Sequence, residues 1–190
     1  SQLVRTADEG IRAAEAIGYP VVAKIVSETI LHKTEAGGVK LNLKSAEDVR
    51  AAIGSMSKLS DRFLIEAMVT DAVAELIVGV IRDPQLGPVL VVGAGGILVE
   101  LLAETRTLLL PTTDAEIETA IRSLRAFKLL DGFRGRPRGD LAAAVKAVAA
   151  VARYAEANTA SLVELDVNPL MIRPEGHGAV AADALIRLAV

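Results

Sequence analysis

The sequence predicts an α+β fold. Apolar residues at helical spacing follow three helix-start signals, and runs rich in Val, Ile and Leu, bounded by Gly, Pro or Asp, indicate strands between them. The resulting order is helix, strand, loop, strand, helix and strand, then a group of strands, then helices and a last group of strands. A doubly wound parallel sheet needs regular strand–helix alternation, so this order favours layered α+β units.

Helix starts are marked by Ser or Thr followed three residues later by an acid, a pattern in which each side chain accepts the other residue's free backbone N–H. The three pairs are Thr6 with Glu9, Ser45 with Asp48, and Thr113 with Glu116. A fourth helix is expected from about residue 140 to 157, because its many alanines favour helix and allow close packing.

Strands are expected wherever short apolar runs lie between turn-forming residues. These runs are residues 21–26, 38–43, 63–69, 74–81, 89–92, 97–101, 107–110, 161–167, 170–173 and 178–182. Thr70 and Asp71 interrupt two of the apolar runs, so we expect the chain to divide there into units of residues 1–69 and 70–190.

Composition excludes several classes of protein. The 190 residues contain no Cys, which excludes a disulfide scaffold, a zinc finger and a cysteine nucleophile. A net charge of −3 and 3% aromatic residues offer no footprint for nucleic acid. Mean hydropathy is +0.41, but the longest uncharged run, residues 84–99, is shorter than the roughly 20 residues of a membrane span. With no signal peptide visible, we expect a cytoplasmic protein that does not contact membranes.

A lysine in the middle of an apolar strand opens the first candidate segment. Lys24 must reach solvent, pair with an acid or meet an anion, because an unpaired buried charge is costly. The loop after the strand contains His32, Lys33 and the pair Gly37 and Gly38, where the backbone can approach a ligand closely. Together with Lys40, these lysines suit a polyphosphate, and an imidazole can accept a phosphoryl group. A snorkelling lysine and a solvated histidine are the simpler alternatives.

Residues 93–96, Gly-Ala-Gly-Gly, invite a nucleotide-binding interpretation. The segment is not GxGxxG, since Leu98 stands where the third glycine belongs, and the chain has no Walker A sequence. A tight hairpin turn between two apolar strands is therefore the favoured expectation.

Polar residues alternate along the predicted strand 161–167 and beyond it. Glu164, Asp166 and Asn168 share one face. If a tight turn centres on residues 175 and 176, Asn168 lies across from Asp183, with Cβ atoms about 5 Å apart. An amide and carboxylates so placed suit Mg²⁺ shared with nucleotide phosphates. A solvated polar face on an edge strand, or a register slipped by one residue, remains the alternative.

Two acids flank the expected division between the units. Glu66 ends one apolar run and Glu75 begins the next. Exposed backbone at such a junction can read an adenine edge, since domain junctions often hold ligands. The alternative is a pair of strand-end charges in water.

Taken together, these segments resemble the ATP-grasp module of the ADP-forming acyl-CoA synthetases (acetate–CoA ligase, ADP-forming) and, more distantly, the β subunit of succinyl-CoA synthetase. The matching runs occur in family order and cover nearly the whole chain: GYPVVAKI, ILHKTEAGGVKLNL, FLIEAMV, AELIVGVIRDPQLGPVL, GAGGILVELL, LLDGFRGRPRGD, VELDVNPLMI and AADALI. The resemblance implies an ATP-grasp fold of two α+β subdomains with the nucleotide between them, residues 1–69, incomplete at their start, and 70–190.

The resemblance implies roles for residues of the first subdomain. Lys24 is similar to the lysine that contacts the ATP phosphates, and the segment containing Lys33, Gly37 and Gly38 resembles the one that lies over them. Its His32 matches a phosphoryl-carrying histidine. Glu66, Ala67 and Met68 resemble the hinge that reads adenine, largely through backbone groups.

The second subdomain matches the family at further positions. Glu75 is similar to the acid that holds the ribose, and Asn168 and Asp183 resemble the Mg²⁺ ligands. Asp166 occupies the acidic position beside the phosphohistidine site, where the resemblance implies a catalytic role. Arg82 and Glu100 match positions near the nucleotide.

The family reaction is acyl-CoA + ADP + phosphate ⇌ acid + ATP + CoA, through phosphohistidine. The resemblance implies ATP or ADP and Mg²⁺ as cofactors of this chain. It implies CoA, and the acyl-CoA or carboxylic acid, only through CoA-binding and ligase domains of a parent chain or partner subunit. An oligomer is compatible with this organisation. Alternatives are a regulatory nucleotide-binding ATP-grasp module fused to an acetyltransferase, and another ATP-grasp carboxylate ligase.

Overall fold

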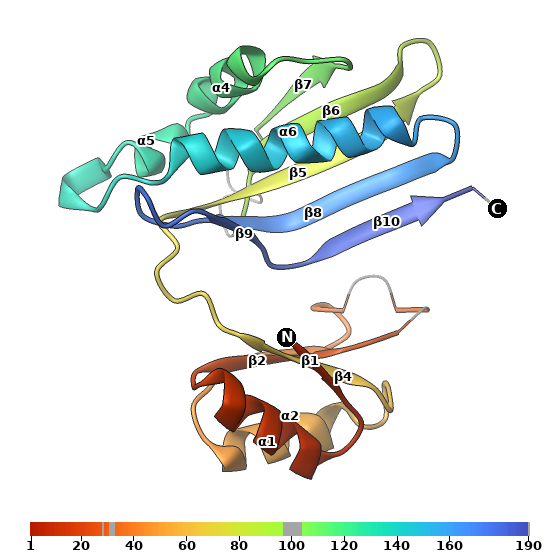
Figure 1. The fold of residues 1–190 in the computed structure, drawn as a ribbon, viewed down its shortest axis with the longest axis vertical. Coiled ribbons are helices and arrows are strands. Elements are labelled where there is room, and N and C mark those ends of the chain that lie inside the picture. Colours follow the sequence, from red (N-terminus) through yellow and green to blue (C-terminus); the bar gives the residue numbers. More distant parts are fainter. Residues whose placement is uncertain (28, 31–32, 97–103, 190) are drawn as a thin grey trace. The chain divides into compact units, whose positions relative to one another are not determined.

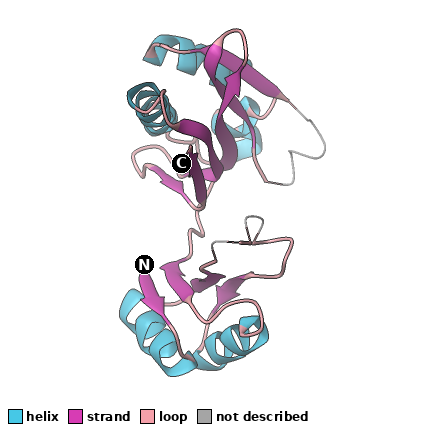
Figure 2. Cartoon of the chain, turned by 90° about the vertical axis from the view of Figure 1, so that its right-hand side faces the viewer, coloured by secondary structure: helices cyan, strands magenta, loops and turns pink. Residues whose placement is uncertain are grey.

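The computed structural model describes residues 1–27, 29–30, 33–96 and 104–189. The chain separates into two compact units, Ser1–Thr70 and Asp71–Val190, drawn in Figures 1 and 2. Each unit has its own sheet and its own core, and each is described by itself.

The first unit is a four-stranded antiparallel sheet with helices on one face (Figure 1). Its elements are β1 (Gln2–Val4), α1 (Ala7–Ile17), β2 (Val21–Ile25), β3 (Val39–Leu43), α2 (Ala46–Met56) and β4 (Phe63–Ala67). The strand order is β1-β4-β2-β3. The two central strands, β2 and β4, therefore come from distant parts of the unit's sequence.

Side chains alternate along these strands, so one face of the sheet is buried under the helices and the other is not. Val21, Ala23 and Ile25 of β2 are buried and pack with the helices in one apolar cluster. The intervening residues, Val22 and Lys24, therefore face away from the helices. On β4 the same alternation buries Phe63 and Ile65 and turns Leu64 and Glu66 to the helix-free face.

The second unit is a larger antiparallel sheet with helices on one face (Figure 1). Its strands are β5 (Ala74–Asp83), β6 (Gly87–Ala94), β7 (Thr105–Leu109), β8 (Leu162–Ile172), β9 (Ala179–Ala181) and β10 (Ala184–Leu188). They run in the order β10-β8-β5-β6-β7, with β9 paired to β8. The helices are α4 (Asp114–Ser123), α5 (Phe127–Leu130), the short 3₁₀ turn η1 (Phe133–Gly135) and α6 (Leu141–Ala157).

The core of the second unit lies between its sheet and its helices. Leu76, Val78 and Val80 of β5 are buried there with small residues of α6, including Ala144 and Ala152. Alanines on this helix allow its backbone to approach the sheet closely. The odd-numbered residues of β5, from Glu75 to Ile81, face the helix-free side.

All four predicted helix starts are confirmed, but only one of the three predicted Ser or Thr pairs has the reciprocal bonds. Thr113 accepts from Glu116 N–H, and the Glu116 carboxylate accepts from Thr113 N–H at 2.8 Å. At the other two starts the acid reaches one residue further back. Glu9 accepts from Arg5 N–H, and Asp48 accepts from Lys44 N–H.

Most predicted strands are present, with three differences. Residues 161–167 and 170–173 belong to the single strand β8, and the short edge strands β1 and β10 were not predicted. The expected tight turn at residues 93–96 is wrong, because Gly93 and Ala94 are inside β6 and Gly93 pairs with Thr105 of β7. The expected strand at residues 97–101 lies outside the described residues. Among the helices that the structure describes, none has the length and apolar character of a membrane span.

Candidate functional site

An ion pair joins the two central strands on the helix-free face of the first sheet. Lys24 Nζ of β2 contacts Glu66 Oε2 of β4. The pairing of Val22 with Glu66 and of Lys24 with Leu64 places the two charged residues diagonally on one face. Their side chains are only 12% and 27% exposed. Lys24 thus presents its charge at the sheet surface beside a carboxylate, in a partly dehydrated environment where charge interactions are strengthened.

The backbone of Ala67 points away from β2. Met68 N–H donates to the Pro20 carbonyl at 3.1 Å, and hydrogen bonding alternates along an antiparallel pair, so the N–H and C=O of Ala67 turn to the other side. The N–H and C=O of Ala67 are thus directed to the β1 side of β4, whereas Met68 N–H is already engaged by Pro20.

The loop after β2 is described only in part, and its predicted phosphoryl carrier, His32, lies outside the described residues. Lys33 begins a turn closed by Gly38 N–H donating to the Lys33 carbonyl at 2.7 Å. Gly37 has φ of +74°, which favours glycine. A Cβ at Gly38 would lie 2.5 Å from Ile25 Cδ1. Packing on Ile25 thus explains Gly38 without a ligand.

Lys40 does not join Lys24, contrary to the expectation of a shared anion site. Lys40 pairs with Ala23, whereas Lys24 pairs with Val39. Paired residues share a face, so Lys40 leaves β3 on the opposite side from Lys24.

Acidic groups line the helix-free face of the second sheet. Asp166 of β8 lies opposite Gly79 of β5, and a Cβ at Gly79 would lie 3.7 Å from Asp166 Oδ1. That separation is ordinary van der Waals contact, so an alanine would also fit beside this carboxylate. Glu75 lies further along β5 on the same face, opposite Met171.

Two glycines pack directly on Glu75. Gly95 N–H donates to the Glu75 carbonyl at 2.7 Å, and a Cβ at Gly95 would lie 2.8 Å from the Glu75 carbonyl carbon. Gly96 has φ of +62°, and its Cβ would lie 2.6 Å from Glu75 Oε2. The glycine-rich segment thus holds the start of β5 and leaves space for the carboxylate of Glu75. The matching position Glu100 lies outside the described residues.

The predicted hairpin register is confirmed. Met171 pairs with Val180 and Val167 with Ala184, so one register runs through β9 and β10. Asn168 N–H donates to the Asp183 carbonyl at 3.1 Å, which places these residues directly across from each other. The pairing of β5 with β8 changes register between Leu76 and Val78. Two residues of β8, 168 and 169, therefore lie opposite one residue of β5, and the neighbouring Val167 and Leu170 are both buried.

This donor set fits a small hard cation. The Asn168 amide and the Asp183 carboxylate supply oxygen donors, and Mg²⁺ is commonly held by one or two carboxylates together with substrate phosphates. Within the described residues, no group of three or more His, Asp or Glu side chains gathers as a metal site. The assignment of Asn168 and Asp183 as ligands stays a prediction.

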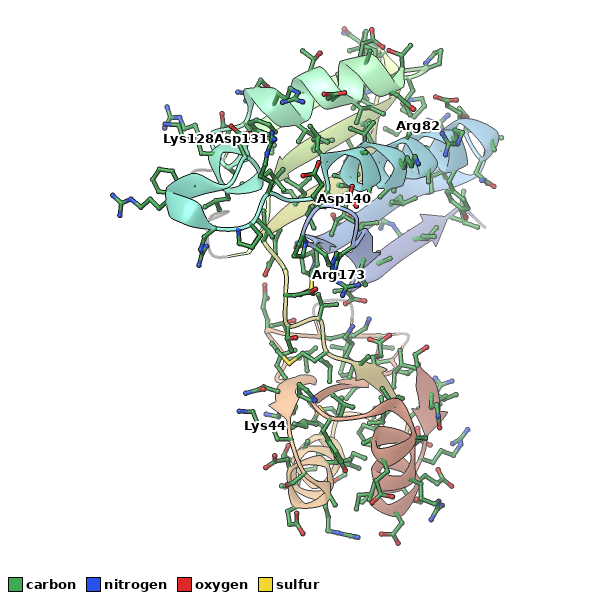
Figure 3. All side chains as sticks on the ribbon, turned by 60° about the vertical axis from the view of Figure 1, so that its left-hand side comes forward. Lys44, Arg82, Lys128, Asp131, Asp140 and Arg173 are labelled. Atoms are coloured by element: carbon green, nitrogen blue, oxygen red, sulfur yellow. The ribbon has the colours of Figure 1, made fainter. Side chains whose placement is uncertain are left out.

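Arg82 does not lie with the other candidates. It is seven residues from Glu75 along β5, so alternation directs the two side chains to opposite faces. Its guanidinium donates to the Thr159 carbonyl, just beyond α6, at 3.0 Å (Figure 3). Arg82 therefore stays outside the site that we propose below.

Two polar anchors near the hairpin were not predicted. The Asp140 carboxylate accepts from Ala143 N–H at the start of α6, and from Gly176 and Gly178 N–H in the hairpin turn. These bonds, that of Ala143 first, lower the pKa of Asp140. Arg173 binds Asp71 at 2.9 Å, fastening the start of the second unit to the end of β8 (Figure 3). Long-range contacts of this kind have no local sequence signal.

A model of the ATP-grasp domain matches residues 1–188. The chain belongs to the ATP-grasp family. This ATP-grasp chain is 33% identical over 195 residues to the beta subunit of ADP-forming acetate–CoA ligase II from Pyrococcus furiosus, covering 98% of the chain and 83% of that subunit. It is 37% identical over 199 residues to the ADP-forming 4-hydroxybutyrate–CoA ligase of Nitrosopumilus maritimus. That match covers 99% of the chain but only 28% of the ligase.

A solved structure from Ca. Korarchaeum cryptofilum resembles the whole ATP-grasp chain. It is a dinucleotide-forming acetyl-coenzyme A synthetase 1 in complex with coenzyme A and Mg-AMPPCP, with its phosphohistidine segment pointing towards the nucleotide-binding site. The TM-score is 0.82 at 34% identity, covering 99% of this chain and 84% of that one. The two ligases named above are ADP-forming acid–CoA ligases, and this chain corresponds to an ATP-grasp part of such enzymes.

Proposed function

We propose that this chain is the nucleotide-binding, phosphoryl-transferring module of an ADP-forming acyl-CoA synthetase. The observation that supports it most is the Asn168–Asp183 pairing, which puts an amide and a carboxylate across from each other beside Asp166. The chain's relatives among acid–CoA ligases that form ADP support the same assignment.

The first unit binds the nucleotide through the ammonium group of Lys24 and the backbone N–H and C=O of Ala67. Lys24 neutralises negative charge on the phosphates, which compete with Glu66 for its ammonium group. Ala67 offers the N–H and C=O that suit an adenine edge. Lys33, Gly37 and Gly38 belong to the segment that covers the phosphates and contains His32.

The second unit supplies the oxygen ligands. Asn168 and Asp183 hold Mg²⁺, which neutralises phosphate charge when it is bound. Glu75 accepts hydrogen bonds from the ribose hydroxyls. Asp166 supplies the catalytic carboxylate of the phosphohistidine step, since an acceptor for one imidazole N–H leaves the other ring nitrogen to take or give the phosphoryl group.

The full reaction needs groups that lie outside residues 1–190. Acyl-CoA and phosphate yield an acyl phosphate and CoA, and the phosphoryl group then passes to histidine and on to ADP. CoA-binding and ligase domains, in the same parent chain or in a partner subunit, bind CoA and choose the acid. The work of the present module is positioning and charge neutralisation.

Phosphohistidine formation tests this proposal. The full-length protein, incubated with Mg²⁺ and ATP labelled at the γ-phosphate, is expected to gain acid-labile, base-stable phosphate. His32→Ala abolishes the label, whereas His177→Ala, at the 58% exposed side chain in the hairpin turn, retains it. Nucleotide binding without any label, unchanged by His32→Ala, would instead assign a regulatory module.

A further inference from the structure

A strongly basic segment lies outside the proposed nucleotide site. Residues 125–138, here called the basic segment, contain one acid, Asp131, in a chain whose net charge is −3. Its five basic residues are all exposed: Arg125, Lys128, Arg134, Arg136 and Arg138. Phe133 is 46% exposed in the middle of it. Figure 1 shows α5 and the turn after it at one end of the helical layer of the second unit.

The backbone of the basic segment has an uncommon conformation. Gly132, Arg134 and Gly135 have φ of 86°, 54° and 77°. Glycine adopts this left-handed region readily, but for Arg134 it is an uncommon and costly state. The Arg134 guanidinium carbon lies 5.2 Å from the centroid of the Phe133 ring. The turn thus presents a cation and an aromatic ring together on the surface.

Both ends of the turn are fastened to the body of the unit. Gly139 N–H donates to the Leu130 carbonyl at 2.8 Å, and Arg138 binds Asp131 at 2.9 Å across the base. The Arg138 carbonyl accepts from Glu175 N–H in the hairpin turn. Arg134 and Arg136 therefore lie on a turn whose backbone is held in place. A preordered turn loses less conformational entropy when a partner binds.

We propose that the basic segment is the docking surface for an acidic face of the CoA-binding or ligase part of the same enzyme. This inference rests on the proposed function, which requires that part. Arg beside an exposed aromatic side chain is the composition enriched at protein interfaces. Arg138 lines a cavity beside α6, but the other four cations are spread along the exposed segment outside it, which fits an extended acidic surface better than a single small anion. The 4-hydroxybutyrate–CoA ligase has most of its length outside the matched region, where such a surface can lie.

Zero-length cross-linking of the full-length protein, or of its complex with a partner subunit, tests the contact. A carbodiimide joins the Lys128 amine to a carboxylate that touches it. We expect a cross-link from Lys128 to an Asp or Glu outside residues 1–190. Cross-links that stay within residues 1–190, or protection of Lys128 by added CoA without any such link, would overturn the proposal.

A matched pair of charge reversals provides the second readout. Arg134→Glu with Arg136→Glu is expected to reduce the cross-link and the overall turnover about tenfold, with stronger dependence on ionic strength, as for complementary charged surfaces. Arg12→Glu with Arg153→Glu makes the same charge change at exposed helical positions and should leave both unchanged. Equal effects of the two pairs would contradict the proposal. Nucleotide affinity is measured separately for each variant. If none of the proteins binds nucleotide, the proposed function is refuted, whereas a loss of the cross-link alone concerns the docking surface.

Discussion

Lys24 and Glu66 form an ion pair across the two central strands of the first sheet, on the face that the helices leave uncovered. The pair gives the lysine a partner before any phosphate arrives. Phosphate oxygens would therefore compete with Glu66 for the same ammonium group, or share it.

Removing the lysine should weaken nucleotide binding. Charged hydrogen bonds contribute about 1.5–3 kcal/mol, so Lys24→Met is expected to raise the dissociation constant for Mg·ADP by roughly ten- to a hundredfold. Isothermal titration calorimetry measures this constant directly. Lys58→Met, at an exposed lysine beyond α2, serves as the control and should bind normally. Normal binding by Lys24→Met would remove Lys24 from the site.

Neutralising the partner should have the opposite effect on binding. Glu66→Gln keeps the side-chain shape but no longer competes for the ammonium, so we expect several-fold tighter Mg·ADP binding. The fold should lose about 1 kcal/mol, because a partly buried charged pair becomes a weaker neutral contact. Calorimetry and urea unfolding test the two effects separately. Weaker binding by this variant would mean that Glu66 holds Lys24 in its productive position.

The cross-strand pair of the second sheet should determine magnesium dependence. Asp183→Asn is expected to raise the Mg²⁺ concentration needed for half-maximal ADP binding about tenfold, because a carboxylate ligand becomes neutral. Binding of ADP without Mg²⁺ should be unchanged. Asp114→Asn, at an exposed first-turn residue of α4, is the matched control. A similar loss with and without Mg²⁺ would indicate damage to the hairpin.

Asp140 should stabilise the second unit in a pH-dependent way. Its pKa is lowered by backbone N–H donors that the unfolded chain lacks, so the ionised form stabilises the fold above the ordinary value of about 4. That contribution is lost as pH falls through the lowered folded-state pKa. Asp140→Ala should cost about 1–2 kcal/mol at pH 7 and progressively less below pH 4, as followed by urea unfolding. A cost that is independent of pH would contradict this assignment.

Local signals predicted much of the fold. The hairpin register followed from one turn, because Glu175 and Gly176 occupy its centre and the pairing on either side is then determined. The helix starts followed from side chains three residues apart. Both depend on contacts between residues that are close in sequence.

Contacts between residues that are distant in sequence could not be predicted from local patterns. The strand order β1-β4-β2-β3 brings Glu66 to Lys24 across most of the first unit, and no local pattern encodes that neighbourhood. Short edge strands such as β1 owe their conformation to the strand beside them. Arg82 is a different case, because the sequence was sufficient there. Side chains alternate along a strand, and Arg82 is an odd number of residues from Glu75, so the two must lie on opposite faces of the sheet.

The single register of the long hairpin restricts how this chain can change in length. Because β9 and β10 both take their alignment from the turn at Pro174 to His177, one residue inserted between Ala179 and Asp183 would rotate every later side chain of β10 to the other face. Asp183 and Asn168 would then no longer be across from each other. A change of length along the arms should therefore break the cross-strand pairing, and a change at the tip should break the bonds that Gly176 and Gly178 make with Asp140.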